Sequence, residues 1–539
     1  MERHIGVWHI EGKNDKTDVG ELIIDGNHIE FHSRFFKPPF KIAFIGNDGN
    51  NSYKVFVQGY TNGGNHKTIA NTLSHRVYYV LMQNYKFAND FNVSGIMEFS
   101  FIIPELTNWL GIDTVHYCYT YDDTLAAAEY HMSPIIIKSA NPKIEIYFKS
   151  SSLSNSTMAD DSTEINISKK PRIRVSYNKP VDIQEITSEI ECLMQFFGLL
   201  IGKVSNAEDI ILTIKDQDLK SWLFINHDYS YNFMTQDTLD ITQYILDKPR
   251  IYYYVVEDKI KSYYSKWRKF FNNDDFSLLR RVYFSVNNKK EKYAEEVFVE
   301  YMRFLDGYHT RISGDADKEK ALKDAIKESQ KVIRLKIFDD EGRPIFEKEI
   351  QKVIPDWKYN EKNVINIPEV IARSYVERKG LSHRLKELDK KHFNIISKNA
   401  LNIEKLPLKN NDYNEKIKAH LKRKFNNITD EEVEEKFNGL TPEEKDDYLI
   451  EIYYKELGDT RNYYSHYKKD KTGVLEDIQL SESINVLKAT IISILLYHIG
   501  IIKEIRRKML AFDSELFLKT DFLIKKDEKP FISPKNGTR

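Results

Sequence analysis

The side chains best suited to chemistry lie in one short segment near the carboxyl end, residues 457–466, with the sequence LGDTRNYYSH. Arg461 supplies a fixed positive charge for a phosphate, and His466 supplies an imidazole that can move a proton near neutral pH. Cleavage of RNA without a metal requires these two groups. On an ideal helix Asn462 and His466 share a face, so the amide could orient the imidazole, whereas Arg461 projects about 100° away. The catalytic candidates are therefore Arg461, Asn462 and His466.

One copy of this set is incomplete, and two copies across a dimer interface would place two arginines and two histidines around one phosphate. One His466 would then take the proton of the ribose 2′-hydroxyl, and the partner's His466 would protonate the leaving 5′-oxygen. Arg461 would stabilise the negative charge of the transition state. Because DNA lacks the 2′-hydroxyl, the expected substrate is RNA.

Aromatic and basic residues beside this set are the candidates for substrate binding. Tyr463 and Tyr464 could stack on a base, although at least one of them is expected to face the core. Lys468 and Lys469 follow directly and could contact the phosphate backbone. A second basic stretch, residues 259–281, interleaves lysine and arginine with aromatic residues, and a solvated helix face explains it at least as well as phosphate contact.

The helices expected around the segment must position these side chains. Residues 441–444, Thr-Pro-Glu-Glu, predict a strong helix start, with a cap residue, a proline at the first helical position and a glutamate at the third. The apolar face that follows is expected to end at Gly458, and Asp459 or Thr460 to cap a second helix that carries the motif. The apolar run 486–502 is interrupted and too short for a membrane span, so it predicts a buried core helix.

The first 250 residues predict a β-rich domain. Short alternating runs divided by glycine and asparagine predict strands at residues 21–24, 28–31, 41–45, 54–57, 77–81, 97–103, 135–137, 144–148, 173–177, 209–214 and 222–225. This spacing implies an antiparallel sheet structure, either a sandwich or an open barrel. Residues 183–201 have helical periodicity, and the polar stretch 149–168 is expected to be a mobile loop.

Beyond this domain helical periodicity dominates, so the predicted fold class is α+β: an antiparallel β-rich domain at 1–250, then an all-α bundle with insertions at 251–539. A helix around Phe298 to His309 is expected to be the first core helix, with His309 a packed core histidine. Residues 321–333 and 417–425 are amphipathic, and 332–350 predict a hairpin that projects from the bundle.

Composition limits the classes of protein. The chain has 539 residues, 41% hydrophobic and 30% charged, which fits two or three soluble globular domains. The net charge of −1 gives no global field that draws in nucleic acid, so an RNA site must be a local patch. Two cysteines are too few for a disulfide framework, and no signal segment is evident. We therefore expect a cytoplasmic protein with no membrane partner.

Other chemistries have little support in the sequence. The motifs GxxxxGK[ST], HExxH and GxSxG are absent, which disfavours an NTPase, a zinc protease and a serine hydrolase. His28, Glu30 and His32 alternate on one predicted strand and could ligate zinc, but a solvent-facing strand gives the same pattern. We expect neither a metal nor another cofactor.

Two sets of residues resemble known families. Arg461 to His466 resembles the RxxxxH motif of the HEPN superfamily, in which a polar residue follows the arginine. Residues 5–8 (IGVW), 20–24 (GELII) and 29–31 (IEF) resemble the opening of ApeA-type antiphage proteins. Residues 99–111, FSFIIPELTNWLG, are similar to that family's strand before its Leu-x-x-Trp signature.

Two features depart from the family pattern. Asp306 and Gly307 stand where a glutamate and a bulkier residue are expected, and the length between residues 312 and 441 is expanded. The role of Asp306 therefore stays open.

The resemblance implies a metal-independent endoribonuclease of antiphage defence, acting by abortive infection and leaving 2′,3′-cyclic phosphate ends. It implies RNA as substrate, with tRNA as one candidate, a homodimer or higher homo-oligomer, and a β domain that senses or regulates in response to an unknown phage trigger. Three alternatives remain. The HEPN module could be a non-catalytic scaffold that binds RNA or protein, the β domain could bind carbohydrate or protein on a helical stalk, or Arg461 could pair with Asp459 while His466 packs between helices.

Overall fold

A computed structural model gives the structure of most of the chain. The residues that it leaves undescribed are 1, 12, 26–27, 34–40, 48–50, 65–71, 84–94, 112–114, 120–124, 130–132, 157–162, 203–206, 215–219, 226–248, 289–292, 313–379 apart from 324, 327, 328 and 348, 407–411, 426–427, 467–472, 514–515, 517–520, 527 and 532–539. The chain forms two compact units, one of residues 1–293 with 492–539 and one of residues 294–491. The domain boundary near residue 250 stays a prediction.

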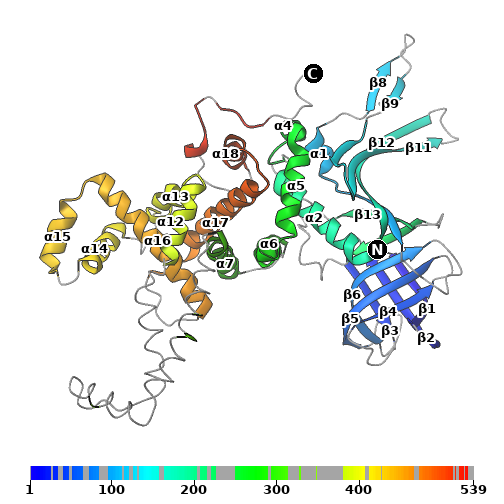
Figure 1. The fold of residues 1–539 in the computed structure, drawn as a ribbon, viewed down its shortest axis with the longest axis horizontal. Helices are drawn as coiled ribbons and strands as arrows, with labels where there is room; N and C mark the ends of the chain where they lie inside the picture. The colour runs from blue at the N-terminus through cyan, green and yellow to red at the C-terminus, as the bar shows by residue number, and fades with distance from the viewer. Residues whose placement is uncertain are drawn as a thin grey trace. The chain divides into compact units, whose positions relative to one another are not determined.

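The first six strands of the first unit form a closed ring. They are β1 (Glu2–Ile10), β2 (Lys13–Asp25), β3 (His28–Ser33), β4 (Lys41–Asn47), β5 (Ser52–Gly64) and β6 (Thr72–Gln83). All pairings are antiparallel in the order β6-β3-β2-β1-β4-β5, and β5 pairs with β6 to close the ring (Figure 1). The sequence predicted either a sandwich or an open barrel. The β5–β6 pairing instead makes a closed barrel.

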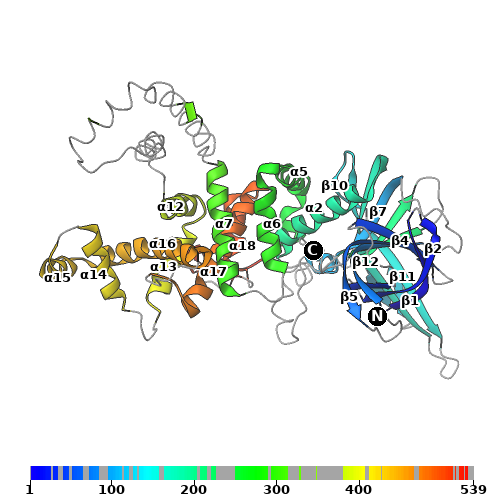
Figure 2. The same ribbon diagram turned by 90° about the horizontal axis from the view of Figure 1, so that it is seen from below.

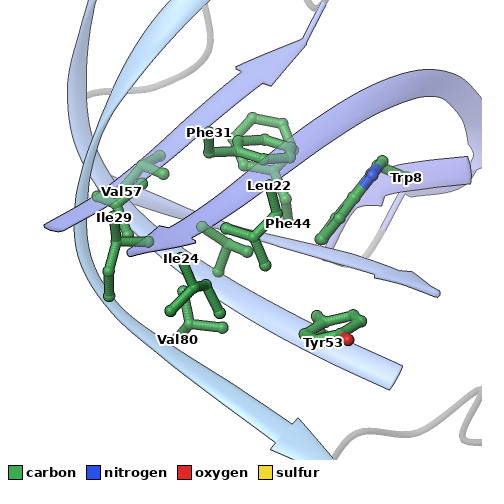
Figure 3. Packing of buried hydrophobic residues seen from close by; sticks show 11 residues of the cluster. Trp8, Leu22, Ile24, Ile29, Phe31, Phe44, Tyr53, Val57 and Val80 are labelled. Carbon is green, nitrogen blue, oxygen red and sulfur yellow. The ribbon is translucent and has the colours of Figure 1, made fainter. Parts of the chain in front are cut away.

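Aromatic side chains fill the interior of this barrel (Figure 3). Trp8, Phe31 and Tyr53 are fully buried, and the Trp8 and Phe31 ring centroids lie 4.7 Å apart. Trp8 Nε1 donates a hydrogen bond to the Gly20 carbonyl at 3.1 Å. A Cβ atom at Gly20 would lie 2.8 Å from Trp8, and one at Gly46 would lie 2.3 Å from it. Glycine is therefore required at both positions by the close approach of the indole.

A second group of strands extends the sheet from β6. These are β7 (Ile96–Ile102), β10 (Ile135–Lys138), β11 (Lys143–Ser156), β12 (Thr163–Val181), β13 (Glu208–Ile214) and β14 (Lys220–Ile225), in the order β10-β11-β12-β7-β13-β14-β6. A separate hairpin pairs β8 (Val115–Tyr119) with β9 (Leu125–Glu129). Each predicted strand lies within or overlaps an observed strand, so the antiparallel β-rich region is confirmed.

The prediction of a mobile loop at residues 149–168 is wrong for residues 149–156 and 163–168, which the structure describes. β11 and β12 pair continuously from Lys143 with Ser176 to Ser156 with Thr163. The serine and asparagine content concealed the strands, because backbone pairing does not depend on an alternating apolar pattern.

The helices of the first unit are α1 (Leu106–Leu110), α2 (Ile183–Ile201), α4 (Tyr253–Val256), the short 3₁₀ segment η2 (Glu257–Lys259), α5 (Ile260–Phe271), α6 (Asp274–Asn288), α18 (Lys503–Ala511) and the 3₁₀ segment η3 (Asp521–Leu523). α5 packs against α2 and against β10 of the sheet, and both views show α2 beside α5 (Figure 1, Figure 2). Asp182 caps the amino terminus of α2, and Trp267 of α5 donates to the Cys192 carbonyl of α2 at 2.9 Å. Trp109 of α1, in the Leu-x-x-Trp signature, packs edge-on against Phe197 of α2.

The second unit is helical. Its helices are α7 (Ala294–Ile312), α12 (Leu381–Lys391), α13 (Ile395–Glu404), α14 (Tyr413–Lys424), α15 (Asp430–Asn438), α16 (Pro442–His466) and the first part of α17 (Asp477–His498). α16 packs against α7, α12, α13 and α14. Figure 1 shows α14 and α15 beside the amino-terminal part of α16, where Ile417, Phe437 and Ile452 share one apolar cluster. The α+β fold class is confirmed.

The predicted core helix is α17, which begins at Asp477 and ends at His498. By length and apolar composition it is the one helix among the described residues that could span a membrane, but 67% of its most apolar window is buried. Leu487, Ile491 and Leu495 are fully buried. These contacts are those of a helix in a protein core. The predicted hairpin at 332–350 and the segment 321–333 fall outside what the structure describes, except for isolated helical positions.

Candidate functional site

The helix that carries the motif begins as the sequence predicted. Thr441 N donates to Glu444 Oε2 at 2.8 Å, and Glu444 N donates to Thr441 Oγ1 at 3.2 Å. This reciprocal pair is a capping box, and Pro442 occupies the first helical position. The start of α16 is therefore determined by local sequence.

The predicted end at Gly458 is wrong, because α16 continues without a break to His466. Gly458 keeps helical geometry instead of the left-handed φ of a glycine that ends a helix. A glycine inside a helix costs about 1 kcal/mol relative to alanine, and the packing of four helices against α16 offsets this cost. Asp459 and Thr460 are thus interior residues and not caps.

Thr460 has a tertiary role instead of the capping role expected of it. Its side chain is fully buried, and its Oγ1 accepts a hydrogen bond from Leu475 N at 2.8 Å. Gly473, with φ of 73°, also lies against α16, because a Cβ atom there would lie 3.4 Å from Asp459 Oδ2. The chain between the motif helix and α17 is therefore fixed to α16 at Gly473 and Leu475.

The motif residues lie on the last two turns of α16. Arg461 Nη1 donates to Asn462 Oδ1 at 3.0 Å, and Arg461 Nε is buried without a hydrogen-bond partner among the described residues. His466 is exposed at the last position of the helix. Asn462 thus orients the guanidinium, and no hydrogen bond joins it to His466 in the described part of the chain. Arg461 forms no ion pair with a described carboxylate, which differs from the alternative in which it pairs with Asp459.

The structure describes only two of the four proposed substrate-binding residues. Tyr463 and Tyr464 are both partly buried, with ring centroids 5.0 Å apart and planes at 78°. Ser465 Oγ is buried and has no partner within the described residues. Lys468 and Lys469 lie outside the described residues.

A buried ionic cluster lies before the motif, and sequence reasoning missed it. Lys416 Nζ of α14 lies 2.8 Å from Glu404 Oε2 of α13 and 3.1 Å from Glu456 Oε1 of α16. Burial and the neighbouring Glu404 raise the pKa of Glu456 to about 8, although Lys416 opposes the shift. One signal was available in the sequence, because Glu456 falls among the apolar positions Ile452 and Leu457 of the helix.

A second buried carboxylate joins α12, α13 and α16. Asp389 accepts hydrogen bonds from Ile396 N at 2.7 Å and from Ser397 N at 2.9 Å, which satisfies the amino terminus of α13. Its Oδ2 also accepts from the Tyr454 hydroxyl of α16 at 2.6 Å. Burial raises the pKa of Asp389, although these hydrogen bonds lower it in part.

The two α7 residues considered for the site, Asp306 and His309, both contact α12. His309 is 3% exposed and its Nε2 lies 2.7 Å from Glu387 Oε2 of α12. Asp306 receives a hydrogen bond from Arg384 Nη1 of α12 at 2.6 Å. Both contacts join α7 to α12, and the expectation of a packed histidine is confirmed.

The strand residues considered for zinc form a hydrogen-bonded triplet. Glu30 Oε1 lies 2.9 Å from His28 Nε2, and Glu30 Oε2 lies 3.1 Å from His32 Nε2. Burial raises the pKa of Glu30, but the hydrogen bonds from the two histidines give it a net lowered value. Within the described residues, no group of three or more histidine, cysteine, aspartate or glutamate side chains could hold a metal ion.

Comparison with known families agrees with this arrangement. Residues 402–505 match the family described as Apea-like HEPN, which covers α14 to α17 and therefore the motif. The helical region thus defines the chain as a HEPN protein. Residues 3–267 match the family described as ApeA N-terminal domain 1. The chain belongs to the ApeA-like proteins with a carboxy-terminal HEPN domain, a family of HEPN nucleases of antiphage defence.

No curated protein and no solved structure matched the chain. α7, which was predicted to be the first core helix of the HEPN bundle, lies outside the matched residues, although it packs against α16.

Proposed function

We propose that this protein is a metal-independent endoribonuclease of antiphage defence, in which Arg461 and His466 of two protomers form one composite site. The observation that carries the proposal is the state of these two side chains at the end of α16. His466 is exposed, and the guanidinium of Arg461 is oriented by Asn462 without an ion pair to a described carboxylate. Both groups are therefore available to a phosphate.

The helix geometry supports a requirement for two copies. His466 lies five positions after Arg461, which on an ideal helix is about 7.5 Å along the axis and about 140° around it. The two side chains of one protomer therefore diverge. A second protomer brings its own arginine and histidine to the same phosphate, and HEPN domains typically dimerise.

The chemistry follows from the residue types. One imidazole takes the proton from the ribose 2′-hydroxyl, and the 2′-oxygen attacks the adjacent phosphorus. The bond to the 5′-oxygen breaks, and the partner's His466 donates a proton to that oxygen. Arg461 holds the non-bridging oxygens and stabilises the added negative charge. The products are a 2′,3′-cyclic phosphate and a free 5′-hydroxyl.

The remaining assignments belong to the same proposal. Asn462 orients Arg461, Tyr463 and Tyr464 stack on bases, and Lys468 and Lys469 contact the phosphate backbone. The RNA substrate class includes tRNA. The protein acts in the cytoplasm as a homodimer or larger homo-oligomer, and the β domain responds to a phage trigger. Growth arrest by RNA cleavage is the expected outcome in abortive infection.

The test uses purified full-length protein with end-labelled tRNA and total RNA. We expect the wild type to cleave in the presence of EDTA and to leave cyclic phosphate ends. Arg461→Ala and His466→Ala should each reduce the rate about 10²–10⁴-fold, the usual contribution of acid–base and electrostatic groups, with unchanged thermal stability. Arg423→Ala and His383→Ala, both exposed and on other helices, are matched controls that should cleave normally.

A mixing experiment tests the composite site. Arg461→Ala protein and His466→Ala protein, unfolded together and refolded, should recover part of the activity, because mixed dimers contain one arginine and one histidine at the shared phosphate. Full activity in either single variant would refute catalysis by these residues. Binding of RNA without scission by the wild type would instead favour the non-catalytic scaffold, and loss of cleavage in EDTA would indicate a metal.

A further inference from the structure

A cavity of about 610 Å³ lies between β10 and α5 in the first unit. One wall is the end of β10 with the turn after it, residues 137–140, and the other is formed by α5 positions 261, 264, 265, 268 and 269 with the C-cap residue Asn272. These positions recur at intervals of three and four, so they form a single face of the helix. The volume is in the range of pockets that hold small ligands.

The lining of this cavity is strongly basic. Lys138, Lys261, Arg268 and Lys269 line it, and none of its lining residues is acidic. The nearest carboxylate that pairs with one of these cations is Glu189 of α2, at 2.7 Å from Arg268 Nη1. Four cations thus face the cavity and one paired carboxylate lies behind it, which leaves an excess of positive charge at the cavity wall.

The site is built before any ligand arrives. Glu189 is 4% exposed and accepts hydrogen bonds from both Arg268 and the Tyr264 hydroxyl, so the guanidinium is held in place. Lys138 Nζ donates to the Asn141 carbonyl at 2.7 Å. Burial and the nearby Arg268 lower the pKa of Lys138, so a bound anion would stabilise its charged form.

A solvated helix face does not account for this set. Arg268 and Lys269 lie in the last turn of α5, where cations also complement the helix dipole. Lys261 lies in the first turn, where the same dipole disfavours a cation, and Lys138 is on a strand. The dipole therefore explains two of the four cations, and the other two need a different reason to face the same cavity.

We propose that this cavity binds a phosphate-bearing small molecule of nucleotide size. Lys138, Lys261, Arg268 and Lys269 contact its phosphate groups, and the Ser139 hydroxyl in the turn is a further donor within the lining. Ile137 supplies an apolar wall for the remainder of the molecule. The lining residues up to Ser265 lie in the region that matches the ApeA N-terminal domain, and Arg268 and Lys269 follow directly after it. None of them is among the proposed RNA-cleaving residues, so the site would give the first unit a ligand of its own.

Calorimetry on the full-length His466→Ala protein tests the proposal without RNA turnover. The probes are ATP, AMP, inorganic tripolyphosphate and inorganic phosphate in magnesium-free buffer. We expect saturable binding of ATP or tripolyphosphate at one site per chain, weakening as salt concentration rises. Similar binding of ATP and tripolyphosphate would show that the phosphates alone are recognised, whereas tighter ATP would show contact with the rest of the nucleotide; both support the proposal.

Charge-removal variants connect binding to the cavity. Lys261→Gln with Lys269→Gln should weaken ATP or tripolyphosphate binding at least tenfold, while Lys259→Gln, an exposed lysine of the preceding 3₁₀ segment outside the lining, should not change it. Unchanged melting temperatures of both variants would show that the fold is intact. Equal binding by wild type and double variant, or no saturable binding of any probe, would overturn the proposal. Binding only of an RNA oligonucleotide would overturn it in favour of an RNA path.

Discussion

The middle and the end of α16 hold ionisable groups in opposite environments. In the middle, Glu456 and Tyr454 are buried, and burial raises the pKa of each, that of Glu456 to about 8. At the end, His466 is exposed and Arg461 has no ion pair with a described carboxylate. These perturbed groups thus join the helix to α12, α13 and α14, whereas of the candidate catalytic groups His466 is exposed and Arg461 is half-buried. A shifted pKa by itself would select the structural residues here.

The largest effect should come from removing the cation of the buried cluster. Lys416→Met removes the cation that pairs with Glu404, which is fully buried, and with Glu456. Breaking a buried ion pair in this way costs about 3–5 kcal/mol of unfolding free energy, measured by urea denaturation at pH 7. Lys418→Met on the same helix is the matched control and should change stability less, because Lys418 pairs with the exposed carboxylates of Glu415 and Glu434 and otherwise lies over the Phe437 ring. Equal loss in both variants would remove the contrast between buried and surface charge.

The second effect is a change in how the free energy of unfolding depends on pH. Glu456 has a folded pKa above its unfolded value, so the folded state retains a proton that the unfolded state loses. The stability that this proton supplies is present below about pH 4.5 and is lost as pH rises toward about 8.

Glu456→Gln should therefore flatten the dependence and be more stable than the wild type by about 1–3 kcal/mol near pH 8, measured by urea denaturation across pH 5–9. Asp447→Asn, at an exposed carboxylate of the same helix, should keep the wild-type slope. If the slope were unchanged in Glu456→Gln, the buried cluster would not hold the proton.

The smallest effect concerns the start of the helix. Thr441→Ala removes the hydroxyl that accepts from Glu444 N and should cost about 1 kcal/mol, seen as a lower urea midpoint. Thr441→Ser keeps the hydroxyl and should restore the midpoint. RNA cleavage by both variants should equal that of the wild type, because the motif lies at the other end of α16. A reduced cleavage rate in folded Thr441→Ala protein would show that the two ends are coupled.

The local features of this chain could be predicted with good detail. Alternation predicted the strands of the barrel, and the capping box predicted the first turn of α16, because both depend on neighbouring residues. The motif and the amino-terminal segments 5–8 and 20–24 predicted the family. In the structure these two segments meet, because Trp8 packs directly over Gly20.

Features that depend on distant partners were missed. The polar β11–β12 hairpin exists because each strand supplies the other's hydrogen bonds, and Gly458 remains helical because four helices pack against α16. The buried cluster joins Glu404, Lys416 and Glu456 from three helices, and no local pattern in the sequence pairs these positions.

The sequence by itself determined which residues are the candidates for acting on RNA, since a guanidinium and an imidazole have their chemistry from their types alone. The tertiary structure decided which ionisable side chains are exposed, such as His466, and which are buried in contacts between helices, such as Glu456. Burial, charge pairing and the meeting of β10 with α5 depend on contacts between segments far apart in the chain, and only folding brings such segments together.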